Sequence, residues 1–116
     1  MLTIYHNPRC SKSRQTLALI EEKNHDVTIV EYLKTPLNVA EIKQLLSLLN
    51  VSPLEMMRTK EAEFKEQNLA HADDASLIAA MAATPKLIER PIVTDNTRAI
   101  IGRPPENVLS LMQSVD

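Results

Sequence analysis

Residues 2–14 read LTIYHNPRCSKSR, and this stretch decides the fold. Apolar and polar side chains alternate over Leu2–Tyr5, which predicts a short β-strand. Pro8 fixes its own φ and disfavours helix at the residue before it, so the strand ends here. A helix is expected from Ser11 onward. Cys10 therefore stands where a strand gives way to a helix.

The next segments complete a strand–helix–strand unit. The helix from Ser11 is expected to turn Leu17 and Ile20 inward and to stop at residues 24–26. Residues 27–32 alternate and are rich in β-branched side chains, which predicts a second strand. A strand, a helix and a second strand make a βαβ unit with a right-handed crossover.

The middle of the chain reads as three helices. The first is expected to begin at the N-cap Asn38, the second to run over residues 53–57, and the third to follow Asp73 or Asp74 and end at Pro85. The first and third segments carry apolar side chains at helical spacing, and the second is predicted from the preference for proline at the first helical position. The sequence therefore predicts a helical insertion at about residues 38–84.

The end of the chain returns to strands. Residues 92–94 and 99–101 flank a polar turn, which predicts a β-hairpin. A final helix is expected from Pro104 or Pro105, with an apolar stripe of Val108, Leu111, Met112 and Val115. The resulting order is β-α-β-α-α-α-β-β-α. It predicts the α/β class and a thioredoxin-like fold with the helical insertion, in a single domain over residues 1–116.

The composition narrows the function classes. The 116 residues hold 13 Lys and Arg against 15 Asp and Glu, a formal net charge of -2, which argues against a nucleic-acid partner. The longest apolar run, residues 77–83, is too short to span a membrane, and no secretory signal is evident, so we expect a cytoplasmic protein. A single glycine argues against a phosphate-binding loop, and a single cysteine rules out an intramolecular disulfide and a cysteine-rich zinc site.

Cys10 is the strongest candidate for chemistry. With Ser13 it forms a Cys-x-x-Ser at the start of a helix, where free N–H groups and the helix dipole favour a thiolate over a thiol. The dipole supplies only about 0.3–1 kcal/mol, so cations and hydrogen bonds must supply the rest. His6, Arg9 and Lys12 are close by in the sequence. The alternative is that Cys10 is a small buried hydrophobe.

Three motifs resemble those of a known family. Residues 5–14, YHNPRCSKSR, resemble the His-Asn-Pro-x-Cys-x-x-Ser-Arg signature of the glutaredoxin-linked arsenate reductases, the ArsC family. Residues 90–93, RPIV, resemble its Arg-Pro-Ile-Val segment, and residues 103–104 resemble its third motif. The resemblance covers essentially the whole chain, residues 32–36 included. It implies reduction of arsenate to arsenite with glutathione as co-substrate and glutaredoxin as partner, and no bound metal or organic cofactor.

The resemblance also implies roles for particular residues. Cys10 would be the nucleophile, and Arg58, Arg90 and Arg103 would hold the oxyanion and the arsenylated intermediate. Guanidinium groups suit a tetrahedral oxyanion and offset the charge that accumulates when a thiolate attacks arsenic. Because the sequence has no second cysteine, the thiol that resolves an arsenic–sulfur adduct must come from outside the chain.

Supporting roles follow from the same resemblance. His6 would be a helper near the thiolate, and Ser13 would donate a hydrogen bond to it. Pro91 matches the cis-proline that thioredoxin-like proteins place opposite the active cysteine, so we predict a cis Arg90–Pro91 peptide. Two of the candidates have structural explanations as well. Arg58 is expected at the end of a helix, where a cation suits the dipole, and His6 at the end of a strand is equally explained as a satisfied histidine.

The charge beside Cys10 leaves the reaction open. Arg9 and Lys12 stand where many ArsC enzymes have small neutral residues, which favours either anion binding or a different substrate. One alternative is a glutaredoxin-like thiol oxidoreductase that uses the same Cys-x-x-Ser. Another is a non-catalytic regulator like the Spx proteins, which bind RNA polymerase. Ser13 in place of a second cysteine disfavours an intramolecular redox switch of the Spx kind.

Overall fold

A computed structural model describes residues 2–112 of the chain. The chain divides into two compact units. The sheet unit comprises the residues up to Tyr32 together with those from Arg90 onward, and the helical unit comprises Leu33–Glu89. The predicted insertion at about residues 38–84 falls inside the helical unit. Among the described residues, no helix has the length and apolar character that crossing a membrane requires.

The sheet unit contains four strands, and their placement confirms the predicted strand pattern. The strands are β1 (Leu2–Tyr5), β2 (Val27–Val30), β3 (Ile92–Thr94) and β4 (Ala99–Ile101). They lie in the order β2-β1-β3-β4, with β1 parallel to β2 and the other neighbours antiparallel. The parallel pair is the one joined through a helix, as a βαβ unit requires. β2 ends two residues earlier than predicted.

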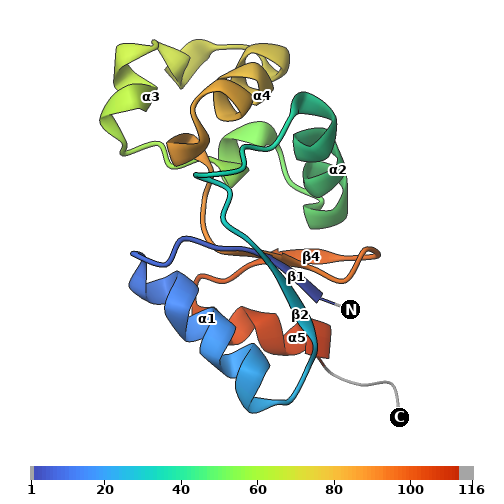
Figure 1. Cartoon of the computed structure of the whole chain (residues 1–116). Helices are drawn as coiled ribbons and strands as arrows, with labels where there is room; N and C mark the ends of the chain where they lie inside the picture. Colours follow the sequence, from blue (N-terminus) through green and yellow to red (C-terminus); the bar gives the residue numbers. More distant parts are fainter. Residues whose placement is uncertain (1, 113–116) are drawn as a thin grey trace. The chain divides into compact units, whose positions relative to one another are not determined.

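Helices cover one face of this sheet (Figure 1). They are α1 (Ser11–Glu22), the 3-10 helix η4 (Pro105–Val108) and α5 (Leu109–Met112). Their apolar side chains pack against β1 and β3 in a buried cluster of Leu2, Ile4, Ile20, Val93, Val108, Leu111 and Met112. The predicted final helix therefore begins as a 3-10 turn at Pro105, and Val115 lies outside the described residues. This packing holds the second half of α1 against β1 and β3.

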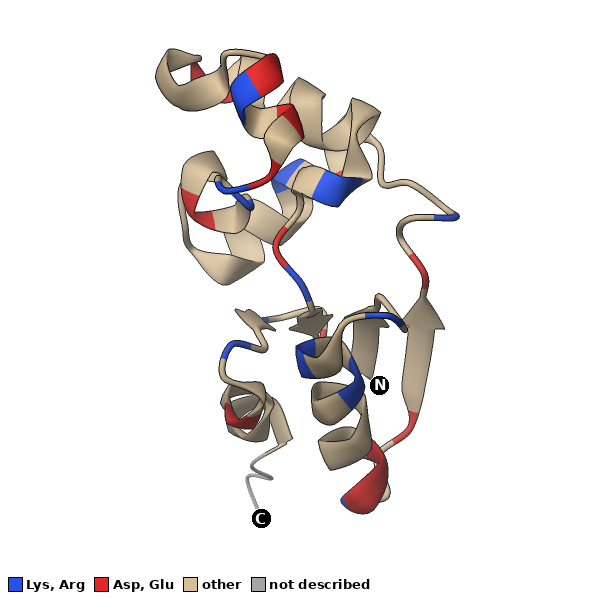
Figure 2. Cartoon of the chain, turned by 90° about the vertical axis from the view of Figure 1, so that its left-hand side faces the viewer, with Lys and Arg blue, Asp and Glu red and all other residues tan. Residues whose placement is uncertain are grey.

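Charge is distributed unevenly along α1 (Figure 2). Its first residues include Lys12 and Arg14, and its last are Glu21 and Glu22. No acidic residue lies in the first turn and no basic residue in the last turn. This is the reverse of the arrangement that the helix dipole favours.

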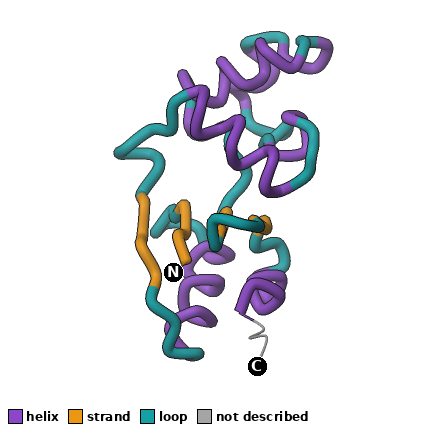
Figure 3. Tube along the Cα trace, turned by 90° about the vertical axis from the view of Figure 1, so that its right-hand side faces the viewer, coloured by secondary structure: helices purple, strands orange, loops and turns teal. Residues whose placement is uncertain are grey.

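The helical unit consists of helices and loops (Figure 3). Its elements are α2 (Val39–Leu49), η1 (Pro53–Met56), α3 (Ala62–Glu66), η2 (Leu69–His71), α4 (Asp74–Ala83) and η3 (Pro85–Leu87). Asn38 caps α2 as predicted, in a reciprocal capping box with Glu41. Asp73 caps α4, accepting a hydrogen bond from the Ser76 N–H.

The middle of this unit corrects the sequence prediction. The expected second helix over residues 53–57 is only the 3-10 turn η1, because Met57 leaves it to form an isolated β-bridge with Ile88. The second α-helix of the unit is instead α3, which the sequence did not predict. Arg58 consequently does not end a helix: it follows the bridge, and its backbone N–H donates to the Leu87 carbonyl. The α/β class and the order of strands and α-helices are otherwise as predicted.

Candidate active site

Cys10 occupies the N-cap position of α1, directly after the loop that leaves β1. Its backbone N–H donates to the Asn7 carbonyl at 3.0 Å, and its own carbonyl accepts from the Arg14 N–H, which begins the helix. The residue is 7% exposed. Hydrogen-bond donors and cations surround its sulfur, so Cys10 is not simply a buried apolar residue of the core.

The surroundings of Cys10 favour its ionised form. Burial is the largest single influence and by itself raises the pKa of the thiol. The Ser13 backbone N–H, the hydrogen bond and charge of the Arg90 guanidinium, and the Lys12 backbone N–H act in the opposite direction. Together they hold the pKa of Cys10 below its ordinary value. A thiolate is the nucleophilic form of cysteine, so the site is arranged for attack on an electrophile.

Arg103 is fixed beside the same sulfur. Its Nη2 atom lies 3.8 Å from Sγ of Cys10, and its Nε–H donates to the Arg90 carbonyl at 2.9 Å. Arg90 and Arg103 therefore converge on Cys10 from the start of β3 and the end of β4. Two guanidinium groups beside one thiolate form a suitable place for a small oxyanion.

Pro91 and Gly102 allow this convergence. The Arg90–Pro91 peptide is cis, which confirms the prediction, and the Arg103–Pro104 peptide is also cis, which was not predicted. The Gly102 N–H donates to the Pro91 carbonyl at 2.8 Å. A Cβ at Gly102 would lie 2.6 Å from Oγ1 of Thr16 and 2.8 Å from Cγ of Pro91. The only glycine of the sequence is thus required for the close approach of β4, Pro91 and α1.

His6 and Ser13 form a buried pair behind the thiol. His6 Nδ1 and Ser13 Oγ are 2.6 Å apart, and Ser13 Oγ also accepts from the Asn7 N–H at 3.0 Å. Burial is the main cause that lowers the pKa of His6, so His6 is neutral near pH 7. Ser13 approaches the sulfur through its backbone N–H, whereas its hydroxyl is engaged with His6 and Asn7.

The structure thus brings together most of the predicted site residues. Cys10, Ser13, Arg90 and Arg103 are neighbours in the sheet unit, with His6 behind Ser13. Arg58 belongs to the helical unit, where its guanidinium pairs with Glu61 at 3.1 Å. Its predicted role in holding the oxyanion stays a prediction. Across residues 2–112, no group of three or more His, Cys, Asp or Glu side chains could hold a metal ion.

Two features that shape the site are absent from the sequence prediction: the residue Thr16 and the backbone carbonyl of Arg90. Thr16 closes the space next to Gly102, and its hydroxyl donates to the Lys12 carbonyl at 2.8 Å. The Arg90 backbone carbonyl orients Arg103. The sequence does contain a sign of the close packing at Thr16: its only glycine, Gly102, stands directly before Arg103. No sequence pattern marks a carbonyl as the partner of a side chain 13 residues away.

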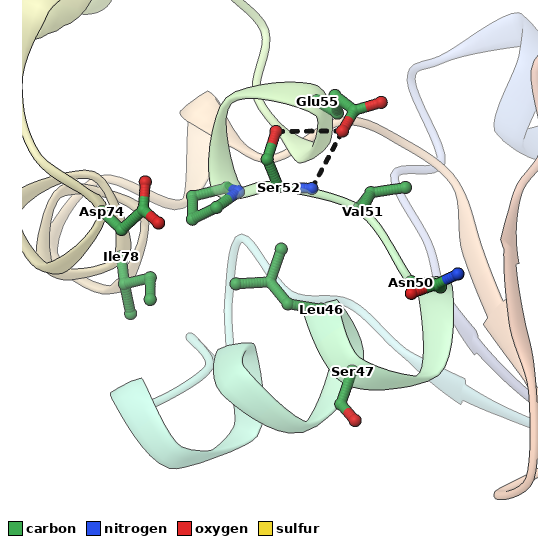
Figure 4. A pocket seen from close by; sticks show the side chains of 9 residues that line it. Leu46, Ser47, Asn50, Val51, Ser52, Glu55, Asp74 and Ile78 are labelled. Atoms are coloured by element: carbon green, nitrogen blue, oxygen red, sulfur yellow. Dashed lines mark hydrogen bonds between the residues drawn. The ribbon is translucent and has the colours of Figure 1, made fainter.

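A pocket in the helical unit is distinct in chemistry from this site (Figure 4). It is an open hollow of about 450 Å³ at the end of α2 and the start of α4, and its apolar lining includes Leu46 and Ile78. Two carboxylates, Glu55 and Asp74, stand at its edge. Its lining includes the hydroxyls of Ser47 and Ser52 but no cysteine and no cation, so it does not compete with Cys10 as a candidate centre for attack on an oxyanion.

Comparisons with known proteins agree with this geometry. The ArsC family profile matches residues 5–111. The chain is 51% identical over 112 residues to the uncharacterized protein YfgD of Escherichia coli K12, covering 94% of each chain. It is 45% identical to an arsenate reductase of Haemophilus influenzae, covering 94% of this chain and 97% of that protein.

A solved structure bears out the fold. The arsenate reductase from Vibrio cholerae matches with a TM-score of 0.90 at 50% identity, covering 94% of this chain and 95% of that chain. The predicted thioredoxin-like arrangement with a helical insertion is therefore confirmed. The family match extends over nearly the whole chain and includes Cys10, Arg90 and Arg103. This protein belongs to the ArsC family.

Proposed function

We propose that this protein reduces arsenate to arsenite through Cys10, with glutathione and glutaredoxin as the source of electrons. The observation that carries the proposal is the position of one cysteine with a lowered pKa between Arg90 and Arg103. Family membership supports it, because several relatives over the same length are named arsenate reductases. A cytoplasmic location, where glutathione is plentiful, fits this supply of electrons.

The first step forms an arsenic–sulfur bond. The Cys10 thiolate attacks arsenic, one arsenate oxygen leaves as water after taking up protons, and arsenic remains As(V). Both the nucleophile and the substrate are anions, so the reaction needs positive charge at the point of contact. Arg90 and Arg103 lie there, and they bind arsenate and offset the charge of the transition state.

The second step reduces arsenic. The sulfur of an external thiol attacks the Cys10 sulfur, the new S–S bond forms, and the arsenic–sulfur bond breaks. Its electron pair leaves with arsenic, which becomes As(III), and the proton of the thiol ends on an arsenite oxygen. The product on the enzyme is a mixed disulfide at Cys10. Since the sequence has no second cysteine, glutaredoxin or a second thiol must regenerate the free thiol.

Coupled turnover tests the proposal. Arsenate, glutathione and glutaredoxin are mixed with the protein, and arsenite is measured directly. We expect arsenite from the wild type, none from Cys10→Ser, and strongly reduced formation from Arg90→Ala. The matched control is Arg98→Ala, because Arg98 is an exposed arginine of the same unit that pairs with Asp95. Circular dichroism checks that each variant is folded.

The alternatives give different results in the same experiment. Activity on a glutathione mixed disulfide without any arsenite would assign the protein to the glutaredoxin-like oxidoreductases. Binding to RNA polymerase without turnover would favour a regulator of the Spx kind. Intact-protein mass spectrometry adds a direct observation. After arsenate and glutathione are added, we expect an adduct on Cys10 that is absent from Cys10→Ser.

A further inference from the structure

Two cations beside Cys10 are not used by the proposed arsenate site. Arg9 and Lys12 are exposed residues on either side of the Cys10–Ser11 pair. Neither side chain forms an ion pair or a hydrogen bond with any of residues 2–112. Arg14 differs, because its Nη1 donates to the Pro8 carbonyl at 2.9 Å and thereby holds the loop. Arg9 and Lys12 are therefore available to a ligand.

Both residues are held near the sulfur by their backbones. The Lys12 N–H is one of the groups that stabilise the Cys10 thiolate, so the Lys12 Cα is one bond from an atom in contact with Sγ. The Arg9 Cα is about 3.8 Å from that of Cys10, and the Arg9 N–H is fixed by Oδ1 of Asn7 at 3.0 Å. Long, exposed side chains from these two positions can reach a molecule that approaches the thiol from solvent.

The charge along the sequence around Cys10 is one-sided. The charged residues between positions 2 and 20 are all cations, namely Arg9, Lys12 and Arg14. The first acidic residue in the sequence is Glu21. Cations at the start of a helix oppose the dipole and cost stability, so local folding does not explain them. Binding of an anion does explain them. Arg90 and Arg103 already provide for the anion at the sulfur itself, so the outer pair fits a second anion.

We propose that Arg9 and Lys12 form a docking site for the carboxylates of the acidic thiol that attacks Cys10. The proposal rests on the proposed function, in which glutathione resolves the arsenic–sulfur bond. Glutathione is a peptide thiol with carboxylates at both ends. The outer cations bind these groups and place the thiol for attack on the sulfur of Cys10. They select an acidic thiol over a neutral one.

Disulfide exchange tests this docking without arsenate. The Cys10 thiolate attacks glutathione disulfide, forms a mixed disulfide and releases one glutathione thiolate. The neutral probe is hydroxyethyl disulfide, and mass spectrometry measures both rates. The ratio of the two rates is the readout, because a change in the reactivity of Cys10 itself cancels from it. Arg9→Ala/Lys12→Ala should lower the ratio about five-fold, and added salt should lower the wild-type ratio towards the same value.

Two further variants make the test specific. Lys23→Ala/Lys43→Ala removes the same charge from exposed lysines elsewhere and should leave the ratio unchanged. Arg9→Glu/Lys12→Glu should reverse the selection, so that the cationic disulfide cystamine reacts faster than glutathione disulfide. An equal ratio in wild type and Arg9→Ala/Lys12→Ala overturns the inference, as does an equal loss in the lysine control.

The same variants separate this inference from the proposed function. If the wild type forms no arsenite but its rate ratio depends on Arg9 and Lys12, the docking site is supported and arsenate is rejected as the substrate. If the wild type forms arsenite and the rate ratio is the same with and without the Arg9 and Lys12 side chains, the proposed function stands and the docking site is rejected. In arsenite formation itself, Arg9→Ala/Lys12→Ala should raise the KM for glutathione and leave the KM for arsenate within two-fold of wild type.

Discussion

The Nε–H of Arg103 donates to the backbone carbonyl of Arg90 at 2.9 Å. This bond fixes the plane of the Arg103 guanidinium, and it leaves Nη2 directed at Cys10, 3.8 Å from Sγ. A lysine presents one ammonium group on a flexible chain and lacks the rigid planar fork in which one nitrogen binds the carbonyl while another faces the sulfur. The arrangement therefore distinguishes arginine from a generic positive charge.

Arg103→Lys should consequently weaken the arsenate site although the charge is kept. We expect kcat/KM for arsenate to fall about ten-fold, or roughly 1.4 kcal/mol, the lower end of what a hydrogen bond to a charged group contributes. Steady-state arsenite formation measures the effect. Thermal stability should change little because the side chain is at the surface. A variant as active as wild type would show that charge alone is sufficient at this position.

The pKa of Cys10 should depend on Arg90. Alkylation by iodoacetamide, measured against pH, should give the wild-type thiol a pKa below the value of about 8.5 for ordinary cysteine. Arg90→Ala removes both a hydrogen bond and a charge that favour the thiolate, so it should move the pKa upward. Arg98→Ala should leave the profile in place. Identical profiles for wild type and Arg90→Ala would remove Arg90 from the activation of Cys10.

His6 should make stability sensitive to acid. Burial lowers the pKa of His6 in the folded protein, so the unfolded chain binds a proton first as the pH falls. The stabilising effect is fully present above the ordinary histidine pKa of about 6.5 and is lost as the pH falls through the lowered pKa of folded His6. Urea unfolding at several pH values should show this loss in wild type. It should be smaller in His6→Gln and unchanged in His25→Gln, which alters an exposed histidine.

His6 should act on the thiol through Ser13 and not through charge. Since His6 is neutral near pH 7, His6→Ala should leave the Ser13 hydroxyl short of a partner in a buried place and destabilise the protein by about 1–3 kcal/mol. A rise in the Cys10 pKa in this variant, without a change in stability, would instead identify His6 as a cationic neighbour.

Gly102→Ala should damage the site through packing. The added Cβ meets Thr16 Oγ1 at 2.6 Å and Pro91 Cγ at 2.8 Å, and overpacking of this kind costs about 1–3 kcal/mol. Displacement of β4 should also move Arg103 and lower the affinity for arsenate. The second variant is Gly102→Ala/Thr16→Ala, in which the nearest contacting side chain is shortened. It should recover part of the stability, and purely additive losses in this cycle would contradict the proposed contact.

Local patterns predicted much of the fold. The hairpin around residues 95–97 and the capping of α2 by Asn38 each depend on residues within a few positions of one another. They could be read from spacing alone. The exchange of helix for 3-10 turn at Pro53–Met56 could not, because it depends on the bridge between Met57 and Ile88, 31 residues apart in the chain.

Some features of the site could likewise be predicted from the sequence, and others could not. The place of Cys10 at the start of α1 follows from Pro8 and the helical pattern that begins at Ser11. The convergence of Arg90 and Arg103 was predicted from motif resemblance, but its physical means, a backbone carbonyl and a glycine against Thr16, required coordinates. The preference of the Ser13 hydroxyl for His6 over the sulfur was likewise beyond the sequence, because several partners compete for one proton.

The charges of α1, which oppose its helix dipole, create a conflict between thermal stability and activity. Exchanging Lys12 for an acid, or Glu22 for a base, would strengthen the helix by complementing its dipole. Selection for heat resistance alone should therefore favour replacements at Lys12 that weaken the docking of the acidic thiol. Replacements at Glu22 escape this conflict, since they lie at the opposite end of the helix from the sulfur. Substitutions that raise thermal stability without loss of activity are therefore expected at the C-terminal end of α1.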